Sequence, residues 1–151
     1  MFEKQPWMQR AGEYPRSNNA YFDLLARAVF SAGLGPKVVE ARWDSLRTAF
    51  HAFDPKKVKL MDEADVGRLL ADPSVIRNRR KIEAVIKNAN TFLETAKGSK
   101  SFHAFLEEAG AGEDLEATAE RLSTVFTHLG RTSAMLFLFS AGWRQREAEV
   151  A

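Results

Sequence analysis

The chain has 151 residues, the size of one ordinary domain, of which 45% are hydrophobic and 28% charged. These fractions are typical of a globular protein and exclude a disordered or collagen-like chain. The absence of cysteine excludes disulfides, thiolate catalysis and cysteine-based metal sites, while a net charge of +2 neither requires nor forbids a nucleic-acid partner.

The apolar segments do not predict a membrane protein. The N-terminal residues 1–7 show no basic segment followed by an apolar one, so no signal peptide is expected. The longest apolar stretch runs from Ala134 to Trp143, whereas a bilayer span needs about 20 such residues. We therefore expect a soluble, cytoplasmic protein with no membrane partner.

The chain begins with an aperiodic stretch followed by a first helix. Residues 1–17 carry two prolines and no repeating apolar pattern, which predicts an irregular N-terminal arm. A helix is expected from about residue 20 to 32, with Asn18 or Asn19 as its N-cap. Apolar residues lie nearly all round this helix, so it should be largely buried.

A second helix is expected from about residue 36 to 53, after a glycine-rich turn that ends in Pro36. The Asp54-Pro55 pair should end it and start a short turn over residues 56–60. Its apolar residues follow one another at steps of three and four, which predicts one buried stripe consisting of Val39, Trp43, Leu46, Phe50 and Phe53.

Residues 62–94 predict a short helix, a hairpin connection and a longer helix. Asp62 is the expected N-cap of the short helix, which should end at the Asp72-Pro73 pair. A tight connection over residues 74–78 follows. The longer helix carries one apolar face, formed by Ile82, Val85, Ile86, Ala89, Phe92 and Leu93.

Three further helices are expected towards the C-terminus. A short helix should cover residues 102–109, and an amphipathic one residues 114–129. The last helix is expected to be buried and capped by Thr132 or Ser133. No segment alternates with the period of a strand, so the sequence predicts an all-α fold: a single compact domain of six or seven helices over residues 18–151.

Charge is distributed unevenly along the chain. Residues 77–100 contain seven basic and two acidic residues, a net charge of +5, whereas residues 107–121 contain six acidic and one basic, a net charge of −5. The basic cluster of residues 77–81 stands at the expected start of the longer helix, where backbone N–H groups favour anions. This cluster is therefore either a phosphate-binding site or an ordinary solvated face.

Several segments resemble those of one enzyme family, the DNA-3-methyladenine glycosylase I family. The sequence FHAFDPKKV at residues 50–58 resembles that family's F-x-x-F-D-P-x-x-V block. Residues 76–89, IRNRRKIEAVIKNA, resemble its I-I-R-[HN]-x-x-K-I-x-A-x-x-x-N-A segment, and residues 32–34 resemble its A-G-L/F turn. With a weaker similarity around residues 130–132, the resemblance extends over roughly residues 20–143.

The resemblance implies a helix-hairpin-helix glycosylase, with the helix-hairpin-helix unit at about residues 62–94. Such an enzyme flips an alkylated purine such as 3-methyladenine out of the duplex and hydrolyses its N-glycosidic bond. The implied partner is double-stranded DNA with an alkylated base, bound by a monomer that requires no cofactor. The residues expected to contact the DNA backbone are Arg77, Asn78, Arg79, Arg80 and Lys81.

The chain departs from the family in the implied base pocket. Where the family has a recognition Glu, this chain has Ala28, and Phe30 and Ser31 replace two Gln-type residues. Pro36 replaces an aromatic residue. The family's zinc ligands are Cys and His near both chain ends, so without cysteine, and with a C-terminus that ends at residues 147–151, no zinc is expected. The residues expected to line the base pocket are Tyr14, Tyr21, Ala28 and Phe30.

Three carboxylates are weak candidates for the catalytic role that Ala28 cannot fill. They are Glu13 in the arm, Asp23 on the first helix and Glu40 on the second. Asp23 lies five residues before Ala28, about 140° round the helix, and therefore faces elsewhere. The catalytic residue stays open, since each of the three could equally be a surface carboxylate.

Two alternatives to an active enzyme follow from the same residues. A relative that binds DNA without catalysis would keep the hairpin and lose the pocket. A helical protein-interaction module would instead use the acidic face between Glu107 and Glu120.

Overall fold

The computed structural model describes residues 2–144, and within this range the chain forms helices and no strand. This confirms the predicted all-α fold. The described helices outnumber the predicted six or seven, because the turn after Asp54 forms a helix of its own. In chain order the elements are α1 (Asn18–Ser31), α2 (Pro36–Ala49), the 3-10 turn η1 (His51–Phe53), α3 (Pro55–Val58), α4 (Glu63–Ala71), α5 (Arg79–Gly98), α6 (Phe102–Glu108), α7 (Leu115–Val125) and α8 (Arg131–Ser140).

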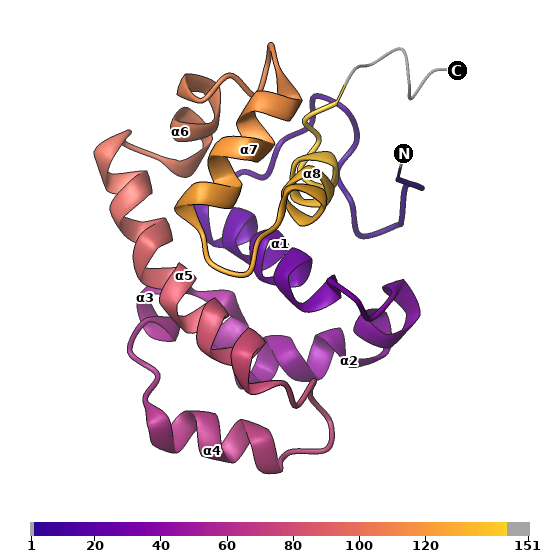
Figure 1. The fold of residues 1–151 in the computed structure, drawn as a ribbon, viewed down its shortest axis with the longest axis vertical. Coiled ribbons are helices and arrows are strands. Elements are labelled where there is room, and N and C mark those ends of the chain that lie inside the picture. The colour runs from indigo at the N-terminus through magenta and orange to yellow at the C-terminus, as the bar shows by residue number, and fades with distance from the viewer. Residues whose placement is uncertain (1, 145–151) are drawn as a thin grey trace.

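Helix α1 lies at the centre of the domain (Figure 1). It packs against α8 on one side, α5 on another and α2 on a third. Nine of its fourteen residues are buried, as the apolar residues all round it predicted. Helix α4 lies at the far end from α6 and α7, with α5 spanning the distance between them. Within the described range no helix has the length and apolar character that crossing a membrane requires.

Aromatic rings fill the core around α1. Phe92 of α5 stacks on Phe102, with ring centroids 4.3 Å apart, and Phe22 of α1 meets Phe92 edge-on at 5.3 Å. Pairs of this kind stabilise a core by about 0.5–1.5 kcal/mol beyond their burial of area. The predicted stripe on the second helix is confirmed, since all of its members are buried: Val39, Trp43, Leu46, Phe50 and Phe53.

The predicted end of the second helix is wrong. Helix α2 ends at Ala49, and His51, Ala52 and Phe53 follow with φ values of 55°, 56° and 54°. Left-handed backbone costs about 1–2 kcal/mol per residue. The turn is stabilised because it brings the Phe53 ring onto Trp43, with centroids 4.9 Å apart. The apolar pattern therefore continued past the point where the helix stopped.

Two of the predicted N-caps are wrong, and one is confirmed. Ser17 caps α1 through its side chain, which accepts from the N–H of Ala20. Asn18 instead accepts from the N–H of Phe102, 84 residues away. Helix α8 begins at Arg131 after Gly130, before either threonine or serine candidate. Asp62 caps α4 in a reciprocal capping box with Asp65, as predicted.

The N-terminal arm is held against the end of α8. The N–H of Gln9 donates to the carbonyl of Ser140 at 2.8 Å, and that of Gly12 to the carbonyl of Gly142 at 2.9 Å. Tyr14 stacks on Trp143 with ring centroids 4.1 Å apart. These contacts fix the arm where it passes over α1 and α2.

Candidate functional site

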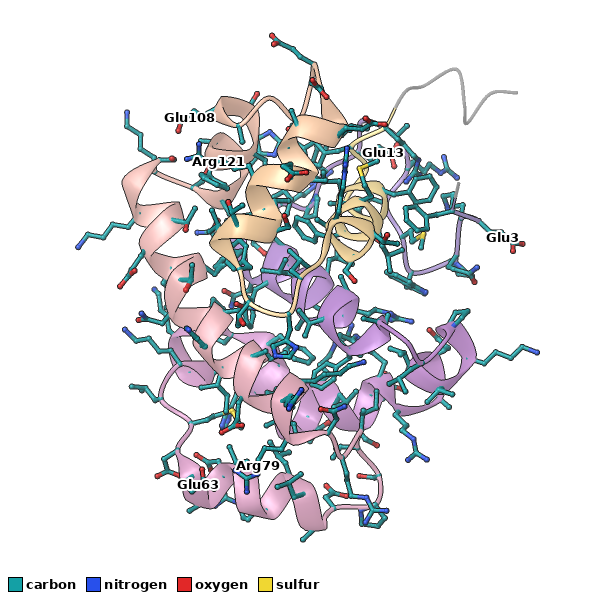
Figure 2. The ribbon with its side chains drawn as sticks, viewed as in Figure 1. Glu3, Glu13, Glu63, Arg79, Glu108 and Arg121 are labelled. Atoms are coloured by element: carbon teal, nitrogen blue, oxygen red, sulfur yellow. The ribbon has the colours of Figure 1, made fainter. Side chains whose placement is uncertain are left out.

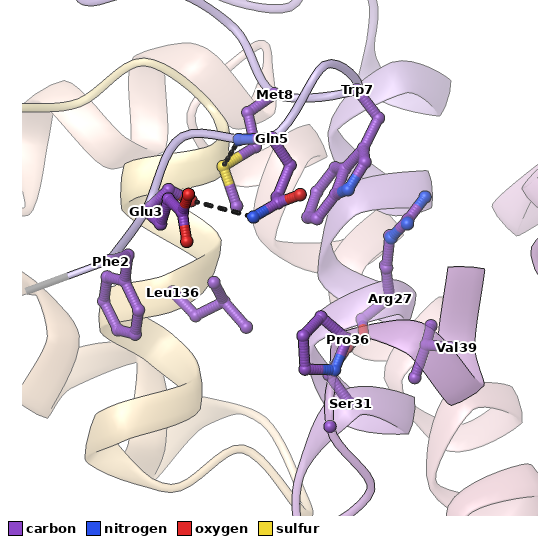
Figure 3. A pocket seen from close by; sticks show the side chains of 11 residues that line it. Phe2, Glu3, Gln5, Trp7, Met8, Arg27, Ser31, Pro36, Val39 and Leu136 are labelled. Carbon is purple, nitrogen blue, oxygen red and sulfur yellow. Dashed lines mark hydrogen bonds between the residues drawn. The ribbon is translucent and has the colours of Figure 1, made fainter.

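A cavity of about 290 Å³ lies beneath the N-terminal arm (Figure 3). The arm forms its roof, the end of α1 and the start of α2 form one wall, and α8 forms the other. Its lining includes Glu3, Gln5 and Trp7 from the arm, Arg27 and Ser31 from α1, and Pro36 from α2. Four segments distant in sequence therefore build this cavity.

Arg27 is the buried charge of the cavity wall, with only 5% of its side chain exposed. Its Nη2 donates to Glu40, and its guanidinium carbon lies 3.7 Å from the centre of the Trp7 ring. Burial lowers the pKa of Arg27, an effect that the Glu40 hydrogen bond opposes. A cation held on an indole in this way contributes about 0.5–2 kcal/mol. The contact binds Trp7, and with it the arm, to α1.

A second ion pair joins α1 to α2 beside the first. Arg47 donates from Nε to Asp23 at 3.1 Å, and the Asp23 side chain is 18% exposed. Burial raises the pKa of Asp23, although the charge of Arg47 opposes the rise. Both residues line a neighbouring cavity of about 370 Å³, which Trp7 also lines. Trp7 thus separates two cavities and lies over the first ion pair.

Ala28 and Phe30 are buried in the core, 2% and 0% exposed, and neither lies on the wall of the cavity under the arm. This differs from the expectation that they line an open base pocket. Arg27 and Ser31 are one helical turn apart and share the face that meets the cavity, whereas Ala28 is rotated by about 100° from Arg27. Phe30 instead packs edge-on against Phe50, with centroids 5.7 Å apart.

Tyr14 and Tyr21, the other two expected pocket residues, lie together in a different place. Both line a cavity of about 460 Å³ that also includes His103. The Tyr21 hydroxyl lies 2.6 Å from Nδ1 of His103 and accepts from Nε1 of Trp143 at 3.2 Å. Burial raises the pKa of Tyr21, so the phenol keeps its proton. The four expected residues therefore do not form one pocket.

The candidate carboxylates occupy three different settings. Asp23 pairs with Arg47, and Glu40 pairs with Arg27 while remaining 63% exposed. Glu13 is exposed on the arm, beside the end of α8 (Figure 2). Glu3, which the sequence did not single out, lines the cavity from the roof but is exposed. Its position on an aperiodic arm offered no signal to find it.

The connection between α4 and α5 is a compact hairpin stabilised by its own side chains. Asp72 accepts hydrogen bonds from the N–H and the hydroxyl of Ser74, at 2.9 and 2.6 Å. These bonds lower the pKa of Asp72. Arg42 of α2 donates to the carbonyl of Pro73 at 2.8 Å, and Asn78 caps α5 by accepting from the N–H of Lys81 at 3.1 Å.

The five residues expected to contact DNA divide into two groups. Arg77 and Arg80 are exposed and form no ion pair with other described residues. Arg79 pairs with Glu63 at 2.8 Å. Figure 2 shows both side chains at the α4–α5 end of the domain. Asn78 is the cap just described. Lys81 turns inward, where its Nζ donates to backbone carbonyls at the end of α1.

Comparison with known proteins settles the family. Residues 7–140 match the family model for methyladenine glycosylase. The chain belongs to this family. A solved structure of 3-methyladenine DNA glycosylase I from Staphylococcus aureus, which describes the structural basis of 3-methyladenine recognition, matches with a TM-score of 0.79 and 27% identity, over 93% of this chain and 87% of that one. The structure of a variant of 3-methyladenine DNA glycosylase I in complex with 3-methyladenine matches with a TM-score of 0.77 and 26% identity, over 93% of this chain and 88% of that one.

Two curated proteins give the same family. DNA-3-methyladenine glycosylase 1 of Escherichia coli (strain K12) is 32% identical over 114 residues, which are 76% of this chain and 61% of that protein. The Haemophilus influenzae DNA-3-methyladenine glycosylase is 39% identical over 85 residues, 56% and 46% of the two chains. The alignments thus span less than two thirds of either relative.

The residues of this chain do not supply the cysteine ligands of the zinc site that the sequence resemblance implied. The sequence has no cysteine, and within residues 2–144 no three His, Asp or Glu side chains lie close enough to hold a metal ion. Residues 147–151, where the sequence resemblance placed the C-terminal zinc ligands, lie outside the described residues. The arm and the end of α8 are joined instead by the Tyr14–Trp143 stack and the backbone hydrogen bonds of the arm.

Proposed function

We propose that this member of the methyladenine glycosylase family is a DNA base-excision repair enzyme. It binds double-stranded DNA that carries an alkylated purine such as 3-methyladenine, extrudes the base and hydrolyses its N-glycosidic bond. The observation that carries the proposal is the cavity under the arm, at the end of α1, in a chain that matches the family over residues 7–140. We further propose that it acts as a monomer in the cytoplasm.

The cavity supports this function through its position and lining. Ser31 and Pro36 occupy positions at which the family resemblance places pocket residues, and both line the cavity. Trp7 provides an aromatic face on which a flat base can stack, and Gln5 provides an amide for its polar edge. Arg27 holds one face of Trp7, which leaves the other for the base.

The proposed reaction needs little activation of the leaving group by the protein, because a purine methylated at N3 is cationic and already a good leaving group. The bond between the base nitrogen and the sugar breaks with its electron pair going to the base, which leaves neutral, and water adds to the sugar carbon and loses a proton to solvent. Binding the extruded base and positioning it near water is then the main contribution of the site. This fits a cavity whose wall contains neither Asp23 nor Glu40, both of which form ion pairs outside it.

The hairpin is the proposed contact to the DNA backbone. Arg77 and Arg80 project into solvent at the start of α5, where they can neutralise phosphates without breaking an existing ion pair. Asn78 orders this helix end as its cap, and Arg79 would first have to leave Glu63. The salt exponent is the steepness with which DNA affinity falls as salt concentration rises. Removing one phosphate contact should lower this exponent by about 0.9.

The test is release of free base from methylated duplex DNA, measured by chromatography, together with DNA affinity at several salt concentrations. We expect release by the wild-type protein, slower release by Trp7→Ala at unchanged DNA affinity, and weaker DNA binding by Arg77→Ala and Arg80→Ala. Lys87→Ala, which removes an exposed charge from the same helix, is the matched control. Binding without release would favour the non-catalytic relative, and absence of binding would favour the protein-interaction module.

A further inference from the structure

Lys81 connects the hairpin to the wall of the cavity. Its backbone N–H donates to the side chain of Asn78, the cap that ends the hairpin, at 3.1 Å. Its side-chain Nζ donates to the carbonyl of Phe30 at 2.9 Å and to that of Ala32. One residue therefore binds the start of α5 and the end of α1, about 50 positions apart in sequence.

The cation at the end of α1 comes from another helix. The last carbonyls of any helix lack partners within the helix, and a positive charge there interacts favourably with the helix dipole. Helix α1 has no basic residue in its own last turn. Lys81 supplies the charge from α5, and its partial burial lowers the pKa of Lys81, as expected for an ammonium group taken from water into a protein contact.

The carbonyls that Lys81 holds belong to the segment that forms the cavity wall. Ser31 lies between them and lines the cavity, as do Gly35 and Pro36 just beyond. Gly33 and Gly35 have φ values of +79° and +83°, a conformation that other residues rarely adopt. The position of this turn relative to the hairpin is therefore set in part by one ammonium group.

We propose that Lys81 is a positioning residue that couples DNA binding at the hairpin to the shape of the cavity. The inference rests on the proposed function, in which Arg77 and Arg80 bind phosphate. A shift of the start of α5 on DNA then acts through Lys81 on the carbonyls of Phe30 and Ala32, and so on Ser31 and Pro36. Lys81 is thus reassigned from the expected phosphate contact to a link within the protein.

The experiment follows Trp7, which faces Ser31 and Pro36 across the cavity (Figure 3). Protein labelled with fluorotryptophan is titrated with duplex DNA containing an abasic-site analogue, and the Trp7 fluorine signal is assigned with Trp7→Phe. We expect DNA to shift this signal in the wild type and in Lys81→Arg, which can reach both carbonyls. We expect Lys81→Met to bind DNA with an affinity within about twofold of wild type and the same salt exponent, but with the Trp7 shift lost.

Controls separate coupling from charge and from folding. Lys87→Met removes an exposed cation from the same helix and should keep the Trp7 shift. Lys81→Gln, whose amide can reach one carbonyl, should give an intermediate shift and replaces Lys81→Met if circular dichroism shows that variant unfolded. If the enzyme releases base, Lys81→Met should lower the single-turnover rate at saturating DNA rather than the affinity.

Each other outcome overturns a defined claim. A salt exponent reduced by about one in Lys81→Met, with the Trp7 shift intact, would make Lys81 a phosphate contact and overturn the coupling. A Trp7 shift in Lys81→Met equal to that of wild type, at unchanged DNA affinity, would also overturn the coupling. A wild type that binds DNA but releases no base would refute the proposed function alone, since the Trp7 signal still decides the coupling. A wild type that binds no DNA would refute both.

Discussion

The hairpin and the region beneath the N-terminal arm differ in where their charged side chains lie. Those of the hairpin lie in water, whereas those beneath the arm are withdrawn from it. In the hairpin, Asp72 accepts hydrogen bonds from Ser74 at the surface, which lower its pKa. Beneath the arm, burial raises the pKa of Asp23, and Arg27 is enclosed by Trp7 and Glu40. The hairpin therefore keeps its charged side chains solvated, whereas beneath the arm a buried charge holds the indole of Trp7 in place.

The largest expected effect comes from adding a charge to a buried position of α1, compared with adding one to an exposed position of α4. Ala28→Glu should lower the free energy of unfolding by about 3 kcal/mol or more, because it overpacks a buried position and places a carboxylate there. Ala64→Glu, in the exposed first turn of α4, should change it by about 0.5 kcal/mol at most. Urea unfolding measures both. If Ala28→Glu proved as stable as wild type, the cavity would have to extend to residue 28.

A smaller effect is expected from removing the Trp7 indole that covers Arg27. Trp7→Ala should destabilise the protein by about 2 kcal/mol, since it removes a half-buried indole and the cation–π contact with Arg27. Trp7→Phe should retain about half of that contribution, because a phenyl ring still covers the guanidinium. Denaturant unfolding of both variants checks this. Equal stability of Trp7→Ala and wild type would mean that the arm is held by its contacts to α8 alone.

The two aspartates should give stability differences with opposite pH dependence. The raised pKa of Asp23 means that the folded state binds its proton more tightly, so stability is lost as pH rises from about 4 through the folded pKa. Asp23→Asn should therefore gain stability relative to wild type with rising pH. The lowered pKa of Asp72 means that its contribution is present above about pH 4 and is lost as pH falls through the folded pKa.

Asp72→Asn should accordingly lose stability relative to wild type as pH rises through the acid range. Unfolding of both variants between about pH 2.5 and 7 gives the two slopes directly. Slopes of the same sign would show that the two regions do not differ in how they solvate their carboxylates.

The smallest expected effect is that of Arg79→Ala. Arg79 and both of its partners, Glu63 and Glu83, are exposed, and water replaces such ion pairs at little cost. Its melting temperature should be indistinguishable from that of wild type in calorimetry. A clear decrease would indicate that the α4–α5 contact depends on this pair.

The parts of the fold that the sequence predicted are those decided by residues close together in the chain. The stripe from Val39 to Phe53 and the capping box of Asp62 and Asp65 depend on residues three or four apart, so both could be identified directly. The cap of α1 was wrongly assigned, because Asn18 bonds to Phe102, whose position depends on the whole fold. Ser17 was then left as the residue that caps the helix.

The candidate site was harder to predict because its residues meet only after folding. Arg27 has the sequence character of a surface residue, yet the arm covers it and makes it part of a wall. Lys81 belongs to a basic cluster that predicts phosphate binding, yet it reaches the end of α1. The family resemblance implied that the aromatic residues Tyr14, Tyr21 and Phe30 line one base pocket. The rotation of α1, however, places Phe30 on a different face of the helix from Tyr21.

Sequence by itself determined the all-α fold, the buried faces and the family of this protein, because helical periodicity and family motifs are properties of neighbouring residues. Tertiary structure alone decided which charges lie in water. Burial of Arg27 and Asp23, and the inward turn of Lys81, depend on partners 13, 24 and about 50 residues away. The free energy of a charged side chain depends on the groups packed around it, and those groups are brought together only by the completed fold.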